Sequence, residues 1–250
     1  DPLARAPDRP LIHSLGLAMK AVWLGLWSLI QLARLALTRA RRDKIIIRTL
    51  TYSRRDEIEG KMHCVFFDEI VTSQGPLNFV VSEGRGFAEH CYQRAVPNAV
   101  DFYDDVVPLI ALVARLPLFF RARRTARALR PSATRISAGA ATQLESLVWS
   151  YMARFHAWRL VYRLIAPRTA LVTVALGDAR TPEVAALRSL GIPVLEYQHG
   201  QMTTEDVGYA YTGAVRHLRH SMALPDKLLV VSQDQCDILQ ERGFWAPADL

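Results

Sequence analysis

The chain contains little cysteine, and what it has excludes two classes of small protein. Its three cysteines, Cys64, Cys91 and Cys236, are odd in number and far apart in the sequence. They form neither a disulfide framework nor the CxxC pairs of an ordinary zinc site. We therefore expect a protein of a reducing compartment.

Several sequence motifs of well-known site chemistries are also missing. No GxxxxGK loop, no GxGxxG fingerprint and no GxSxG elbow occurs, which argues against a P-loop enzyme, a standard dinucleotide-binding domain and an α/β-hydrolase. His217 and His220 lie three residues apart, but no nearby acid completes a metal-binding set. We expect no metal and no cofactor, and we interpret this pair as surface histidines.

Long uncharged runs are also lacking. The stretch Leu11–Leu37 is strongly apolar, but only positions 21–33 lie uncharged between Lys20 and Arg34. A bilayer span needs roughly 20 such residues. Trp23 and Trp27 would share one helix face, and Arg39, Arg41 and Arg42 follow. The segment is either an interfacial helix with a basic end or a helix packed on its own domain.

What is present is enough for a large hydrophobic core. The chain has 250 residues, of which 50% are hydrophobic. We predict an apolar helix with a basic end over residues 1–42 and an α/β domain over residues 43–250. Because the sequence begins without Met and stops at Leu250, we expect it to be a piece of a longer protein.

Positive charge is concentrated in one segment. The net charge is +7, and only four of the 31 basic residues are lysines. Seven arginines and no acid lie between Val106 and Leu144, and Arg123 and Arg127 would share a helix face. This face is either solvated or an anion-binding patch for an acidic membrane, a diphosphate-linked lipid or an anionic polymer. No interleaved aromatic ladder accompanies the arginines, so we expect no nucleic acid partner.

The most regular part of the sequence predicts a parallel sheet. Ala170–Leu176 and Ile192–Tyr197 read as buried strands on either side of a helix, Thr181–Leu190. Thr181 would cap this helix and Gly191 would end it. Lys227–Ser232 reads as a third strand, and a helix closed by Gly243 follows it. This order forms a βαβ crossover and therefore an α/β fold with a parallel sheet flanked by helices.

Earlier elements are predicted with less regular patterns. Lys44–Leu50 reads as a short buried strand, because three β-branched residues follow one another. Asp101–Arg130 reads as a helix that breaks near Pro117. Gln143–Ile165 reads as a long helix whose aromatic residues recur at spacings of three and four, which favours core packing.

Candidate catalytic residues follow the predicted strands. In open parallel sheets, ligands bind beyond the carboxyl ends of the strands. His199 lies at such an end, where its imidazole can accept a proton from a hydroxyl near neutral pH. Gly200 permits close approach of a ligand, and Glu196 or Asp178 would orient the ring. The alternative is that His199 is a hydrogen-bonded turn residue with no catalytic role.

A resemblance to a known family begins at the same residues. The run Gly191-Ile-Pro-Val-Leu-Glu-Tyr-Gln-His-Gly200, followed by Gly208-Tyr209, resembles a motif of GT-B type glycosyltransferases of bacterial surface (capsule or exopolysaccharide) synthesis. The HG pair is also similar to one in CDP-glycerol polymerases, whose histidine is thought to act as a base. The resemblance covers 166–250 and fades towards the amino terminus.

The resemblance implies one half of a GT-B fold, the Rossmann-like acceptor-side half, with the donor-binding domain absent from this chain. It implies transfer of a sugar from a nucleotide-activated donor to a glycan or lipid-linked acceptor, with His199 as base or donor-phosphate contact. Gln198, Gly200, Gly208 and Tyr209 would then contact substrate. Such enzymes act in the cytoplasm, at the inner face of the cytoplasmic membrane. The competing interpretations are a non-catalytic Rossmann-like module that binds an anionic glycan, lipid or protein partner, and a peripheral membrane scaffold.

Overall fold

The computed structural model has a mixed α/β fold built on a parallel sheet. It describes five helical positions near the amino terminus, the strands between residues 45 and 103, Tyr209, and residues 106–129, 138–172, 180–198 and 211–250. The five helical positions are Trp23, Leu26, Ile30, Ala33 and Leu37, and their side chains are exposed. No helix among the described residues is long and apolar enough to cross a membrane.

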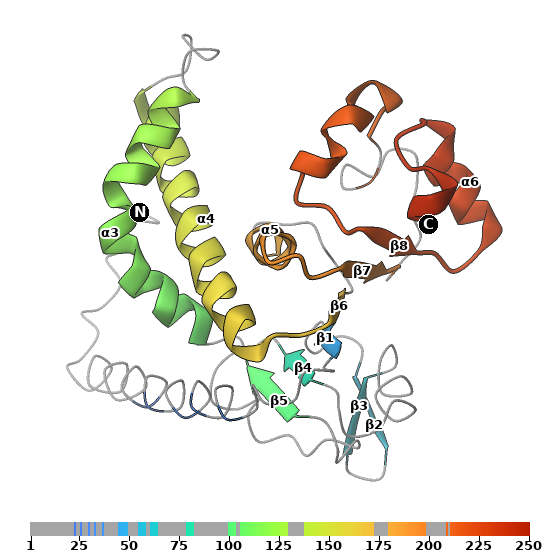
Figure 1. Ribbon diagram of the computed structural model, residues 1–250, viewed down its shortest axis with the longest axis horizontal. Helices are drawn as coiled ribbons and strands as arrows, with labels where there is room; N and C mark the ends of the chain where they lie inside the picture. The colour runs from blue at the N-terminus through green and yellow to red at the C-terminus, as the bar shows by residue number, and fades with distance from the viewer. Residues whose placement is uncertain are drawn as a thin grey trace, which may run out of the picture.

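Six parallel strands form the main sheet, and helices flank it (Figure 1). In chain order the strands are β1 (Ile45–Thr49), β4 (Phe79–Ser82), β5 (Val100–Tyr103), β6 (Thr169–Val172), β7 (Val194–Tyr197) and β8 (Lys227–Leu229). Their order across the sheet is β5-β4-β1-β6-β7-β8, and every neighbouring pair is parallel. A separate antiparallel hairpin consists of β2 (Arg55–Ile58) and β3 (Lys61–Cys64).

Two long helices pack against each other on one side of the sheet. α3 (Val106–Ala128) and α4 (Ala138–Ile165) are antiparallel, since Arg115 lies over Trp149 while Arg123, further along α3, meets the earlier Glu145 on α4. The predicted break at Pro117 is wrong, because α3 runs through this proline. Pro117 lies on the exposed side of α3, so water can reach the carbonyl that loses its donor, and packing on α4 keeps the helix continuous.

The sequence interpretation was also wrong at the start of α3. The expected helix from Asp101 is a strand up to Tyr103, and the helix begins at Val106. The residues of β5, VDFY, include β-branched and aromatic side chains that favour strands, and pairing with β4 satisfies their backbone groups. Tertiary pairing therefore decides the structure of this segment.

The core lies where α4 and α5 (Thr181–Ser189) cover β6 and β7. Ala153, Ala157, Val161 and Ile165 are spaced four apart along α4 and are fully buried. Their small and medium side chains allow the helix to lie close to its neighbours. Of the aromatic residues on α4, Trp158 and Tyr162 are buried, as the predicted core packing requires, and their rings stack on each other. Tyr151, by contrast, is 38% exposed.

The predicted βαβ crossover is confirmed by the parallel pairing of β6 with β7 on either side of α5. Gly191 ends α5 with φ of +70°, a backbone angle that favours glycine, and Gly243 with φ of +71° follows α6 (Gln233–Glu241) in the same way. The predicted N-cap at Thr181 is wrong, since Arg180 holds the cap position and Thr181 is the first helical residue.

A second cluster of buried residues lies beyond β8, among the 3₁₀ helices η3 (Gly213–Ser221) and η4 (Pro247–Asp249) and α6 (Figure 1). Phe244 and Trp245 are fully buried in it. The Arg219 guanidinium lies 5.0 Å from the centre of the Trp245 ring and 3.2 Å from Asp249. This cation therefore joins η3 to the end of the chain.

A buried ion pair supports the first turn of α5. Arg180 Nη1 lies 3.3 Å from Glu183 Oε2, and both side chains are almost completely buried. The Tyr162 hydroxyl donates a hydrogen bond to the other oxygen of Glu183, which links α5 to α4. A buried pair of this kind is costly to break, because the remaining charge keeps its desolvation penalty.

We predict that Glu183→Ala lowers the free energy of unfolding by about 3–5 kcal/mol, since it leaves the Arg180 charge buried without this carboxylate. Chemical denaturation monitored by circular dichroism measures the change. Glu241→Ala, which removes an exposed carboxylate from α6, is the control and should change stability by less than about 0.5 kcal/mol. Equal losses in the two variants would contradict this role of Glu183.

Candidate functional site at the carboxyl end of β7

The parallel strands β6, β7 and β8 end at the same edge of the sheet. Four of the predicted site residues, Asp178, His199, Gly200 and Gly208, lie outside the described residues. Glu196, Gln198, Tyr209, Arg123 and Arg127 are described. The structure therefore describes the residues that border the segment with His199, namely Gln198 before it and Tyr209 after it.

The structure brings Glu196 and Tyr209 together, a contact that the sequence did not predict. Glu196 lies in β7 with no exposed surface, and the Tyr209 hydroxyl donates a hydrogen bond to its Oε1. This bond joins the strand before His199 to the residue after Gly208. A buried carboxylate needs such donors, because its charge has lost its hydration. In this geometry the Glu196 carboxylate holds Tyr209 against β7. Its predicted role in orienting His199 stays a prediction.

Gln198 connects β7 to two neighbouring elements. Its backbone N–H donates to Leu229 O at 2.9 Å, and its side-chain Oε1 accepts from the Val231 N–H at 3.0 Å. The side-chain Nε2 donates to Gln235 Oε1 at 2.8 Å, and both glutamines are buried. Both the carbonyl oxygen and the amino group of the Gln198 side chain are thus hydrogen-bonded within the protein. Gln198 is a positioning residue here, and direct substrate contact stays a prediction.

Tyr209 is fixed from a second direction as well. Its backbone carbonyl accepts a hydrogen bond from Trp245 Nε1 at 3.0 Å, and its ring packs in the cluster of Leu228 and Phe244. Burial also raises the pKa of the nearby Tyr211 hydroxyl above its ordinary value. The connection that carries His199 therefore begins and ends on buried, hydrogen-bonded residues.

The polar residues after β8 belong to a helix cap. Ser232 Oγ accepts a hydrogen bond from the Gln235 N–H at 3.4 Å and so caps α6. Gln233 is exposed and donates to Asp237 at 2.9 Å. Since Gln235 lies in the first turn of α6 and also bonds Gln198, the amino end of this helix lies beside the end of β7.

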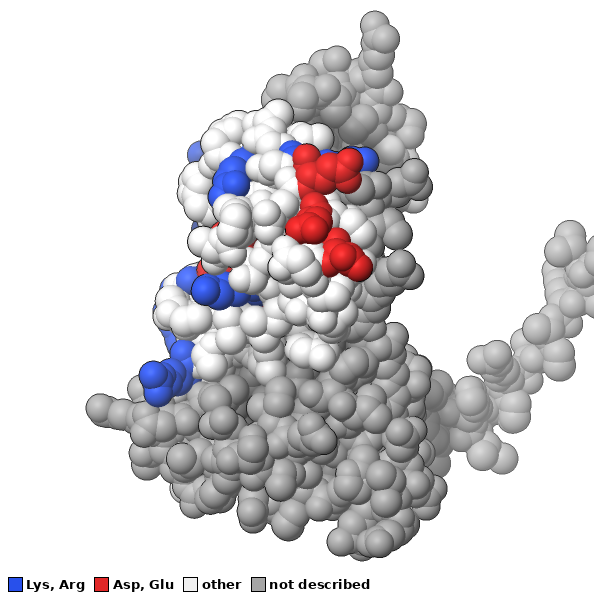
Figure 2. Space-filling model, turned by 90° about the vertical axis from the view of Figure 1, so that its right-hand side faces the viewer, with Lys and Arg blue, Asp and Glu red and all other residues white. Residues whose placement is uncertain are grey.

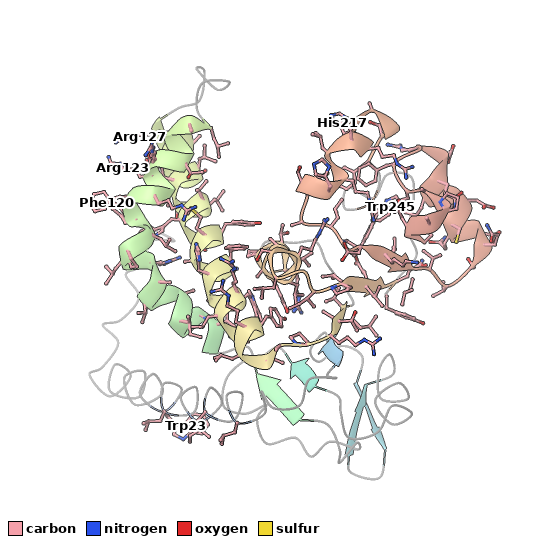
Figure 3. All side chains as sticks on the ribbon, in the orientation of Figure 1. Trp23, Phe120, Arg123, Arg127, His217 and Trp245 are labelled. Atoms are coloured by element: carbon pink, nitrogen blue, oxygen red, sulfur yellow. The ribbon has the colours of Figure 1, made fainter. Side chains whose placement is uncertain are left out.

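Arg123 and Arg127 lie elsewhere in the molecule. Both are exposed on α3 and point outward from it (Figure 3). α3 packs on α4, and α4 packs on α5, so two helices separate these arginines from β7. The structure does not bring them to the edge that carries Gln198.

One buried cation near this edge was missed in the sequence. Arg180 precedes α5, directly after the connection from the carboxyl end of β6, and pairs with Glu183. The only sequence signal was an arginine three residues before a glutamate at a helix start, which is common on solvated surfaces as well. Burial distinguishes this pair, and burial is not visible in so short a pattern.

The histidines at 217 and 220 are exposed on η3, as expected of a surface pair. Among the residues that the structure describes, no group of histidine, cysteine and acidic side chains is arranged to hold a metal ion.

Comparison with known proteins identifies no relative. No family model matches the chain, and neither curated proteins nor solved structures give a match. Function must therefore be argued from the residues and their positions.

We predict that Gln198→Ala lowers the free energy of unfolding by about 1–3 kcal/mol, because the Val231 N–H and the buried Gln235 side chain lose a partner. Thermal or chemical unfolding measures the loss, and hydrogen exchange at Val231 should become faster. Gln233→Ala removes an exposed glutamine bond and is the matched control. If the two variants were equally stable, Gln198 would not fix this edge.

Proposed function

We propose that the chain is the acceptor-side, Rossmann-like half of a GT-B glycosyltransferase of bacterial surface polysaccharide synthesis. It would help transfer a sugar from a nucleotide-activated donor to a glycan or lipid-linked acceptor at the cytoplasmic face of the membrane. The observation that carries the proposal is the anchoring of Gln198 and Tyr209, which border the connection with the His199-Gly200 pair.

The strand order supports the fold proposed here. If the six strands of the main sheet are numbered in chain order, leaving out the hairpin β2–β3, their order across the sheet is 3-2-1-4-5-6. This is the order of doubly wound nucleotide-binding sheets, which bind ligands beyond the carboxyl ends of their strands. Glu196, Gln198 and Ser232 all lie at that end of β7 or β8.

The proposed mechanism assigns proton transfer to His199. Near neutral pH an imidazole can take the proton of an acceptor hydroxyl as this oxygen attacks the sugar carbon. Gln198 directly precedes it and is held by three hydrogen bonds, so the backbone at this point needs little reorganisation. The amino end of α6 lies beside Gln198, and the donor diphosphate would leave the sugar carbon as the new bond to the acceptor oxygen forms.

A specific observation favours the second candidate, a non-catalytic module for an anionic glycan, lipid or protein. Both Glu196 and Gln198 are buried and bonded within the protein, as in a structural core. Titration with nucleotide-activated sugars separates the two functions. The module would neither bind nor hydrolyse a donor.

We predict that His199→Ala in the complete protein lowers the rate of glycosyl transfer by at least about 100-fold, since general base catalysis contributes about this much or more. The folded state should be unaffected, as judged by its thermal melting. His217→Ala, at an exposed histidine of η3, is the control and should retain activity. Full activity of His199→Ala would refute the assignment.

A further inference from the structure

The outer face of α3 carries apolar side chains that contact little of the protein. Leu112, Leu116 and Phe120 are spaced four apart and therefore share one row, with Val113 beside them. Leu116 is 79% exposed and Phe120 is 80% exposed. Contiguous exposed apolar side chains of this kind mark surfaces that bind another molecule or a membrane.

The same face becomes basic towards the end of the helix. Arg123, Arg124 and Arg127 lie three, four and seven residues after Phe120, so they continue the apolar row (Figure 3). No acidic residue occurs in α3. Glu145 on α4 lies 4.0 Å from Arg123, which leaves Arg124 and Arg127 as the main positive charges of this face.

We propose that this α3 face (Leu112, Val113, Leu116, Phe120, Arg124 and Arg127) docks onto an anionic lipid bilayer. The apolar row would enter the interface between headgroups and acyl chains, and the arginines would contact the lipid phosphates. Arginine forms two parallel hydrogen bonds with a phosphate, which favours it over lysine at such a surface. The inference does not rest on the proposed transfer reaction.

A hollow of about 200 Å³ lies beside the face, between α3 and α4. Phe119, Ala122 and Trp149 give it apolar walls, and the ion pair of Arg123 with Glu145 lies at its edge together with polar side chains of α4. Its apolar walls offer further surface to an acyl chain that enters beside the α3 face.

Self-association through this face is disfavoured by its charge. In a parallel pairing of two copies, the arginines of one α3 would meet those of the other. In an antiparallel pairing, each arginine end would lie against the apolar half of the partner. Both arrangements cost free energy, whereas an anionic bilayer satisfies both halves of the face.

A cluster of acidic side chains lies at the opposite end of the molecule, with basic side chains beside it (Figure 2). α3 and α6 lie at the two ends of the longest axis (Figure 1). Acidic side chains gather on the face around α6 (Figure 2), where Asp234, Asp237 and Glu241 are exposed at positions i, i+3 and i+7. A negative surface would therefore repel α6 and attract α3, which orients the protein before contact.

Vesicle sedimentation of the full chain at low salt tests the proposal. Vesicles of phosphatidylcholine alone are compared with vesicles of phosphatidylcholine and phosphatidylglycerol in equal amounts. We expect binding to the anionic vesicles that weakens as salt is added, because screening reduces the attraction. If the wild-type chain fails to bind the anionic vesicles at low salt, the proposal is overturned.

Two double variants, each with a control double variant, test whether the α3 face is the surface that binds the membrane. Leu116→Ser with Phe120→Ser should lower partitioning to anionic vesicles by at least about tenfold, whereas Leu218→Ser with Val231→Ser, at exposed sites on the other side, should not. Arg124→Gln with Arg127→Gln should lower it by about fivefold per arginine. Arg163→Gln with Arg168→Gln removes the same charge from other exposed sites and should have a smaller effect.

Equal effects of the α3 variants and their controls would overturn the assignment to this face, even if the chain still binds membranes through another segment. A concentration-dependent dimer in sedimentation velocity that Phe120→Ser dissolves would also overturn it, in favour of a second copy. The arginine variants keep the test informative if the serine variants fold poorly. Thermal melting of all variants checks the fold.

Discussion

The side-chain amide of Gln198 is the contact on which the carboxyl edge of the sheet depends. It lies just after β7, and it bonds the backbone after β8 and the first turn of α6. Parallel strands do not share a turn, so their ends must be aligned by other contacts. The amide supplies this alignment with a donor and an acceptor in one group, and both are needed because the site is buried.

Tyr209 is held in the same way at the other end of the segment that begins after Gln198. Its hydroxyl reaches Glu196 within β7, and its carbonyl is held by Trp245 near the end of the chain. Residues from β7, α6 and the segment after it thus converge on one strand end. Such convergence holds in place the described residues that border the HG pair, as a preorganised site requires.

The elements that were predicted correctly are those whose hydrophobic pattern agrees with their burial in the structure. β6 and β7 are runs of apolar and β-branched residues, and such runs indicate buried strands. β1 also lies within the strand predicted from its three consecutive isoleucines. Gly191 and Gly243 ended helices as expected, since their positive φ values favour glycine. In β5, by contrast, local sequence did not decide the structure. Pairing with β4 overrode a pattern that also suits a helix.

The candidate site could be predicted only in part, for a related reason. Position after a strand identified Glu196 and Gln198, but their partners Tyr209 and Gln235 are distant in the sequence, and no local pattern shows such a pair. Arg180 and Glu183 were overlooked because an arginine and a glutamate three residues apart occur on exposed helices as well.

Two arginines in the described part of the chain make contacts for which lysine is a poor substitute. Arg188 Nη1 donates to the carbonyls of Met222 and Leu224, at 2.6 and 3.1 Å, and Arg219 Nη2 donates to those of Pro225 and Asp226, at 3.1 and 3.0 Å. A planar guanidinium reaches several carbonyls at once, which a single ammonium group does less well. Arginine content alone therefore does not indicate an anion-binding surface. The arginines of α3 differ because they are exposed and follow an exposed apolar row, and this combination, rather than composition, points to a membrane.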